Sequence, residues 1–248
     1  MHRIFVQIGP FTVYTYGVLI AFAILVSVIL IRRDCVKNGI PFDKILDCIV
    51  FGLIGGIAGA RVLFVLMNLS YFLEYPLKIL AFRDGGMAFQ GGLVLGVVSA
   101  LIACRLKNVG FWQLVDLVAP YIALSHAFGR AGCFFNGCCY GKVIERGIGV
   151  TFPGEDFMRL PTQLYSAFFL VLLFAFLLWF RKKRMFEGAV FSIYLIMYSF
   201  FRFFIEFLRG DNPRVFFGLT IPQALCICTF VAGLSLWVIL SGAEKKES

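Results

Sequence analysis

Long apolar stretches recur along the whole chain and are separated by short polar segments. Seven stretches approach the roughly 20 residues that an α-helix needs to cross a bilayer, and they lie at about 14–31, 45–67, 87–104, 111–129, 162–180, 187–207 and 219–240. This pattern predicts an all-α integral membrane protein with about seven transmembrane helices and a small extracytoplasmic loop region. It also predicts that residues 1–248 form a single polytopic membrane domain.

Basic residues give the predicted orientation of these helices. Short segments rich in Lys and Arg follow the first, third, fifth and seventh stretches, and they contain Arg32, Arg33, Lys37, Lys44, Arg105, Lys107, Arg181, Lys182, Lys183, Arg184, Lys245 and Lys246. All of these segments fall on one side of the membrane, and such loops mark the cytoplasmic side. We therefore expect the N-terminus outside and the C-terminus in the cytoplasm. The two longest loops, at about 68–86 and 130–161, are then outside.

The composition agrees with a protein dissolved in lipid, because 60% of the 248 residues are hydrophobic and only 15% are charged. Soluble domains have about 45–50% apolar and about 25% charged residues. The net charge of +9 does not indicate nucleic-acid binding, since the basic residues lie between apolar stretches, next to anionic lipid headgroups. We expect membrane lipids as partners and no nucleic acid. Arg32 and Arg33 follow the first stretch where a signal peptide would have a cleavage site, so this stretch is expected to be a retained span.

The basic residues outside the predicted cytoplasmic segments are mostly arginine. They comprise nine Arg and two Lys. The planar guanidinium group suits two-pronged contacts with phosphate, so this half of the protein is expected to bind an anionic ligand. Arg3, Arg146 and Arg214 are interpreted instead as solvated loop charges.

Four polar residues recur at helical spacing in and just after the sixth stretch. Tyr198, Arg202, Glu206 and Arg209 fall within an arc of about 80° on a helix. Charges inside a span are costly and are usually paired or functional. Arg202 and Glu206 are spaced to pair, which by itself would fit an internal salt bridge. Two arginines exceed the charge of one carboxylate, and this surplus favours a bound phosphate.

Two further segments carry unusual residues. DGGMAFQGGLVLG contains the paired glycines Gly85, Gly86, Gly91 and Gly92, which permit a re-entrant turn and a close backbone approach to a ligand. HAFGRAGCFFNGCCYG, at the end of the fourth stretch, concentrates an arginine, an asparagine and three cysteines beside the bilayer.

These motifs, in this order, resemble the bacterial phosphatidylglycerol–prolipoprotein diacylglyceryl transferases. The matching positions, which span about residues 9–240, are Tyr16 and Gly17, Gly59 to Arg61, the paired-glycine loop, Gly129 and Arg130, Asn136, Gly141, Pro161 to Tyr165, and the helix with Tyr198, Arg202, Glu206 and Arg209. The Gly-Arg loop and this last helix are the most specific of them.

The resemblance implies an enzyme of the bacterial inner (cytoplasmic) membrane that acts in lipoprotein biosynthesis. It would move the diacylglyceryl group of phosphatidylglycerol to the thiol of a lipoprotein precursor that has a Cys at the signal-peptide junction. A thioether would form and glycerol phosphate would leave.

The resemblance also implies a division of roles. Arg130 and Arg202 are the implied clamp for the leaving phosphate, because preorganised donors in a dry site stabilise developing charge. Glu206 is the third implied catalytic residue and a candidate base for the thiol proton; His126, one helical turn before Arg130, is another candidate. The residues implied to bind substrate are Tyr16, Arg61, Gln90, Asn136, Gly141, Tyr198 and Arg209.

Three positions depart from the family pattern. Cys133 replaces an Asn, Cys138 replaces a Glu, and Gln90 replaces a common His, so a base role for that His does not carry over. The cysteines at 133, 138 and 139 with His126 form a possible zinc set, although their spacing fits no zinc-finger pattern. A disulfide from Cys133 to Cys138 or Cys139 is an alternative in an oxidising periplasm. We expect free thiols, no metal and no cofactor.

Two other functions remain open. A transporter or channel for an anionic solute could also place arginines inside a bundle, but transporters often contain internal repeats, and neither arginine motif is repeated in this chain. A related lipid transferase could act on another acceptor.

Overall fold

The computed structural model describes residues 2–9, 11–81, 85–183, 185–216 and 218–247. The chain forms two compact units. Met1–Ile31 and Val115–Ser248 make up one of them, here called the bundle unit, and Arg32–Leu114 make up the other, here called the hairpin unit.

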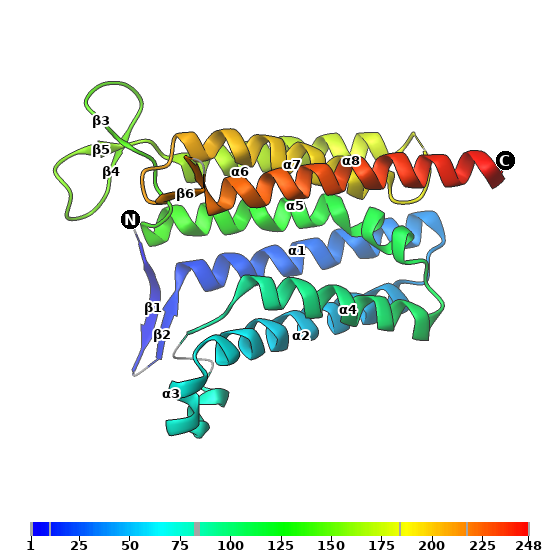
Figure 1. The fold of residues 1–248 in the computed structure, drawn as a ribbon, viewed down its shortest axis with the longest axis horizontal. Helices are drawn as coiled ribbons and strands as arrows, with labels where there is room; N and C mark the ends of the chain where they lie inside the picture. Colours follow the sequence, from blue (N-terminus) through cyan, green and yellow to red (C-terminus); the bar gives the residue numbers. More distant parts are fainter. Residues whose placement is uncertain (1, 10, 82–84, 184, 217, 248) are drawn as a thin grey trace. The chain divides into compact units, whose positions relative to one another are not determined.

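Long helices build the bundle unit, and Figure 1 shows α5, α6, α7 and α8 running side by side. Its helices are α1 (Thr15–Asn38, whose end belongs to the hairpin unit), α5 (Phe111–Asn136, whose first residues belong to the hairpin unit), α6 (Thr162–Arg181), α7 (Ala189–Phe207) and α8 (Ile221–Glu247). The core of this unit contains Ala119, Ala123, Ala127, Leu170, Leu173, Leu177, Val190 and Tyr194. The three alanines are four residues apart, so they lie on one face of α5 and let α6 and α7 approach closely.

Polar contacts connect the start of α5 to the start of α7 and the end of α5 to the start of α6. At its start, the Asp116 carboxylate accepts hydrogen bonds from the backbone N–H groups of Gly188 (2.7 Å) and Phe191 (2.8 Å), where α7 begins. An anion at a helix N-terminus satisfies free N–H groups and complements the helix dipole. Just past its end, the Cys138 carbonyl accepts a hydrogen bond of 2.7 Å from Gln163, where α6 begins.

Short antiparallel strands occupy one end of the bundle unit (Figure 1). They are β1 (Ile4–Ile8) with β2 (Phe11–Tyr14), the sheet β3-β5-β4 (Val143–Ile144, Met158–Arg159 and Val150–Thr151), and β6 (Arg214–Phe216) with β7 (Leu219–Thr220). The sequence pattern predicted no strands here, and it placed the residues of β3, β4 and β5 in the 130–161 loop. The strands pair backbone groups that loops alone would leave without partners.

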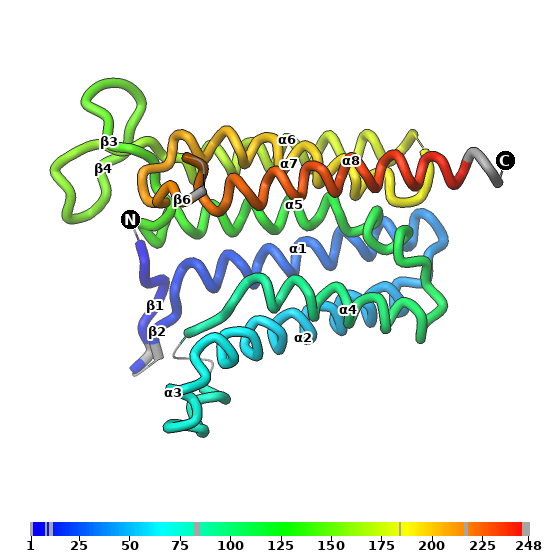
Figure 2. The backbone as a smooth tube through the Cα atoms, in the orientation of Figure 1, coloured from blue at the N-terminus to red at the C-terminus, as the bar shows by residue number. Residues whose placement is uncertain are grey.

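The hairpin unit is built on two long helices, α2 and α4, which run side by side in the backbone tube of Figure 2 and pack through glycines. It contains α2 (Phe42–Met67), α3 (Leu69–Glu74), a short 3-10 helix η1 (Pro76–Leu80) and α4 (Phe89–Lys107). A Cβ atom at Gly59 would lie 2.3 Å from the Gly91 carbonyl oxygen, and the reverse distance is also 2.3 Å. Gly91 therefore serves helix packing, whereas the sequence analysis assigned it to a ligand turn.

The helices confirm a mostly helical, multi-pass membrane protein. Among the described residues, six helices are long and apolar enough to cross a bilayer: α1, α2, α4, α6, α7 and α8. The remaining predicted span, 111–129, coincides with α5, which has 26 residues but is not one of these six. Asp116, His126 and Arg130 interrupt its apolar character.

Candidate active site

A buried ion pair lies on the inner face of α7. Arg202 and Glu206 are 8% and 3% exposed and are in contact, as their spacing predicted. The contact is ionic rather than an aligned hydrogen bond. The other Glu206 oxygen accepts hydrogen bonds from the Asn212 amide and, at 3.1 Å, from the Thr220 hydroxyl. Glu206 is thus held from two sides, and it fixes the position of Arg202.

Arg209 has a carboxylate partner that the sequence analysis missed. Its Nε and Nη2 atoms donate to the two Asp211 oxygens at 2.8 and 2.6 Å, while its Nε lies 3.8 Å from Glu206 Oε2. Burial alone would raise the pKa of Asp211, but the hydrogen bonds and charge of Arg209 outweigh this and hold the pKa below its usual range. Two carboxylates therefore balance the two arginines, and this face of α7 has no surplus positive charge.

The surplus positive charge comes from α5 instead. Arg130 lies half-buried near the end of this helix. Within the described parts of the chain, its guanidinium group has neither an ion pair nor a hydrogen bond. The charges of Arg130 and Arg202 both act on His126. An arginine with free donors next to a buried ion pair is suited to bind an anion.

Aromatic residues of the predicted site pack around the same part of the bundle unit. The His126 and Tyr198 ring centroids are 5.1 Å apart, which joins α5 to α7. Tyr16, at the start of α1, packs against α5 so closely that a Cβ atom at Gly132 would lie 2.8 Å from its ring. The structure thus brings Tyr16, Tyr198 and Arg202 near the end of α5.

The loop after α5 is tied to the start of α6. The amide of Gln163 and the hydroxyl of Thr162 donate to the carbonyls of Cys138 (2.7 Å) and Cys139 (3.0 Å). The Asn136 amide lies 3.6 Å from the Cys138 sulfur. These contacts leave Asn136 and the cysteines half-buried at the edge of the site.

Gly141 has a packing role in the structure. It pairs with Arg209 in an isolated β-bridge, and its N–H donates to the Leu160 carbonyl at 2.9 Å. A Cβ atom there would lie 2.6 Å from Leu160 Cβ and 2.9 Å from the Leu208 carbonyl oxygen. Only a glycine fits this junction. A role in substrate binding stays a prediction.

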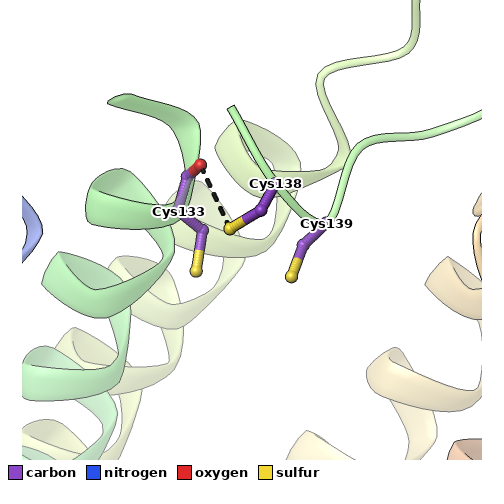
Figure 3. Close-up of side chains that lie close together, drawn as sticks. All are labelled: Cys133, Cys138 and Cys139. Atoms are coloured by element: carbon purple, nitrogen blue, oxygen red, sulfur yellow. Dashed lines mark hydrogen bonds between the residues drawn. The ribbon is translucent and has the colours of Figure 1, made fainter. Parts of the chain in front are cut away.

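The three loop cysteines form a cluster of free thiols (Figure 3). The Cys138 sulfur is 3.7 Å from the Cys133 carbonyl oxygen. A hydrogen bond from Cys133 and the charges of Arg209 and Arg130 lower the pKa of Cys139 to about 5, despite its burial. Burial raises the pKa of Cys138. The three thiols are not joined to one another, so the disulfide alternative does not describe this structure.

The two remaining predicted residues belong to the hairpin unit. Arg61 is 5% exposed and donates hydrogen bonds of 2.5–3.2 Å to the backbone carbonyls of Lys78, Ile79, Ala81, Gly85 and Gly86. These bonds hold η1 and the residues Ala81, Gly85 and Gly86 against α2, so the Arg61 guanidinium group serves the fold. Gln90 is exposed in the first turn of α4. A substrate role for either residue stays a prediction.

Arginines and a buried carboxylate inside a multi-pass membrane protein form a site suited to an anionic ligand. Comparisons with known proteins show which family this protein belongs to. The family model described as prolipoprotein diacylglyceryl transferase matches residues 3–239. The chain therefore belongs to this family, and the resemblance inferred from the motifs is confirmed.

Individual relatives cover nearly the whole chain. A phosphatidylglycerol–prolipoprotein diacylglyceryl transferase of Clostridium tetani is 36% identical over 96% of this chain and 98% of its own. A relative from Shouchella clausii with the same name is 35% identical over 95% of this chain and 89% of its own. A Clostridium perfringens relative is 34% identical over 98% of this chain and 96% of its own. The chain is thus a transferase of lipoprotein biosynthesis, and a transporter is not favoured.

Proposed function

We propose that this chain transfers the diacylglyceryl group of phosphatidylglycerol to the thiol of a precursor Cys at the signal-peptide junction. The family match over residues 3–239 carries this proposal. The thiol sulfur forms a bond to the glycerol carbon, the bond from that carbon to the phosphate oxygen breaks, and glycerol phosphate leaves. The thiol proton passes to a base.

The proposed phosphate clamp consists of two arginines, Arg130 and Arg202, which have different surroundings. Arg130 has a half-buried guanidinium group with free donors, and Arg202 is held in place by Glu206. Preorganised donors of this kind stabilise the charge that develops on a leaving phosphate. Tyr16, Asn136 and Tyr198 can donate further hydrogen bonds to headgroup oxygens. Transfer from labelled phosphatidylglycerol to a Cys-containing precursor peptide tests the reaction, and a peptide with Ser at that position is the control.

We propose that α5 is a seventh span. Its start contacts the start of α7 through Asp116, and its end contacts the start of α6 through Gln163. A helix that extends along two membrane-spanning helices crosses the same thickness of bilayer. Its buried alanines and Asp116 face protein rather than lipid, which explains how a less apolar helix can span. The two units would then form one membrane domain over residues 1–248.

The orientation leads to a testable result. Topology reporters fused in the 130–161 loop should show that this loop lies outside the cytoplasm. Reporters fused near Lys182 should show a cytoplasmic position, because the short loop after α6 is basic. This orientation places the N-terminus outside and the C-terminus inside a bacterial inner membrane. A reporter in either loop on the opposite side would put the arginine site in the wrong leaflet.

The loop cysteines are expected to be dispensable for the chemical step. The accepting thiol comes from the precursor, so a variant with Ser at positions 133, 138 and 139 should keep measurable transfer in the labelled-lipid assay. Cys228→Ser, at an exposed position of α8, is the matched control. Complete loss of transfer with normal membrane insertion would instead indicate a covalent intermediate on the enzyme or an essential metal ion.

A further inference from the structure

Three thiols that are not explained by the transfer reaction converge at the end of α5. The sulfur atoms of Cys133, Cys138 and Cys139 all lie within 4.8 Å of one another, and Figure 3 shows them between the end of the helix and the loop that follows. Thiolates bound to one tetrahedral zinc ion at about 2.3 Å are about 3.8 Å apart. The observed cluster therefore needs only a small closing movement to hold one ion.

The backbone conformation lets two adjacent residues, Cys138 and Cys139, place their sulfur atoms on the same side of the chain. Successive side chains of an extended chain point to opposite sides. Cys139 has a φ of 62°, in the left-handed region that residues other than glycine seldom adopt, and Gly137 has a φ of 70°. The Cys138 N–H also donates to the Cys133 carbonyl at 3.1 Å, which folds the loop back onto α5.

Buried side chains hold this loop in place from outside the cluster. Gln163 and Thr162, which are 1% and 2% exposed, bind the carbonyls of Cys138 and Cys139. Both residues belong to the first turn of α6. The thiols are thus positioned without a disulfide, and a preorganised ligand set of this kind favours metal binding.

Cysteine binds metal ions as a thiolate. Three thiolates and a divalent cation together have a net charge of about −1, which the free guanidinium group of Arg130 complements. Among the described residues, no His, Asp or Glu joins the cluster.

We propose that Cys133, Cys138 and Cys139 bind one thiophilic metal ion of the zinc class through three thiolates. The fourth position stays open to water or to a thiolate from outside the protein, as in zinc sites that keep an exchangeable ligand. Each thiol gives up its proton to solvent as its sulfur binds the ion. Thiolate ligands select zinc and copper(I) over magnesium or calcium.

The test uses the full-length protein, reduced and purified in detergent without metal. Titration with Co²⁺ should produce the intense sulfur-to-cobalt charge-transfer absorption of thiolate ligation, saturating at one ion per chain. Zn²⁺ should displace the cobalt and abolish the absorption. Mg²⁺ should have no effect.

Single Ser replacements at the three positions identify the ligands. Each of Cys133→Ser, Cys138→Ser and Cys139→Ser should weaken cobalt binding at least tenfold, while the control Cys228→Ser should bind normally. Absence of the charge-transfer absorption, when a thiol assay shows that all three thiols are free, would overturn the proposal. So would absorption that survives Cys133→Ser, or a disulfide within the cluster under reducing conditions. The transferase activity is measured separately, so lack of metal binding by the unsubstituted protein, with normal transfer, would reject only the metal site.

Discussion

Replacing Arg130 with Lys is expected to slow diacylglyceryl transfer nearly as much as replacing it with Ala. The Arg130 guanidinium group has free donors at the edge of the site, and a Lys ammonium group cannot reproduce its planar, two-pronged contact with phosphate. Loss of one preorganised donor to a developing charge costs about 2.7–4 kcal/mol, or about 10²–10³ in rate. Single-turnover transfer from labelled phosphatidylglycerol measures this effect.

Arg202→Lys should slow diacylglyceryl transfer to a similar degree. Two surface arginines provide matched controls. Arg146 and Arg214 are exposed, as expected for solvated loop charges, so Arg146→Lys and Arg214→Lys should have nearly normal activity. Near-normal transfer by both Arg130→Lys and Arg202→Lys would show that these are structural charges. The clamp would then have to be sought at Arg61 or Arg209, whose donors bind carbonyl and carboxylate oxygens in this structure.

The helices of the fold were predictable because the length and hydrophobicity of a span are local properties of the sequence. Each predicted stretch coincides with a long helix, including 111–129 with α5. The two-residue strands β3, β4 and β5 have no such signal, since they depend on pairing across a loop. The close packing of Gly59 against Gly91 could not be predicted either, because the sequence alone does not show which helices pack together.

The site was predictable where its residues share one helix. Helical spacing alone indicates the Arg202–Glu206 pair, and the structure confirms their contact. Asp211 was missed because it lies beyond the helix, in a turn that places it against Arg209. Arg61 looks like a ligand-binding residue in the sequence, yet backbone carbonyls from a later segment occupy its donors. Such contacts between segments distant in sequence decide which arginine remains free.

Glu206 provides the second prediction with a large effect. Glu206→Ala should lower the free energy of unfolding by about 3–5 kcal/mol, because it leaves Arg202 buried without its carboxylate. Asp47→Ala is the control, because it removes the carboxylate from an exposed ion pair in which the Asp47 and Lys107 side chains are 44% and 40% exposed. It should lower the free energy of unfolding by at most about 1 kcal/mol. Denaturant unfolding in detergent measures both.

Glu206→Gln then separates positioning from proton transfer. A Gln oxygen can still accept hydrogen bonds from Asn212 and Thr220, so the fold should largely hold while Arg202 loses its ionic partner. Both oxygens of Glu206 are already engaged, and we therefore expect slower transfer with an unchanged pH profile. His126→Gln should instead change the pH profile, since His126 is the other candidate base and lies beside Tyr198. Loss of the acidic limb of the profile in Glu206→Gln, with His126→Gln unaffected, would identify Glu206 as the base.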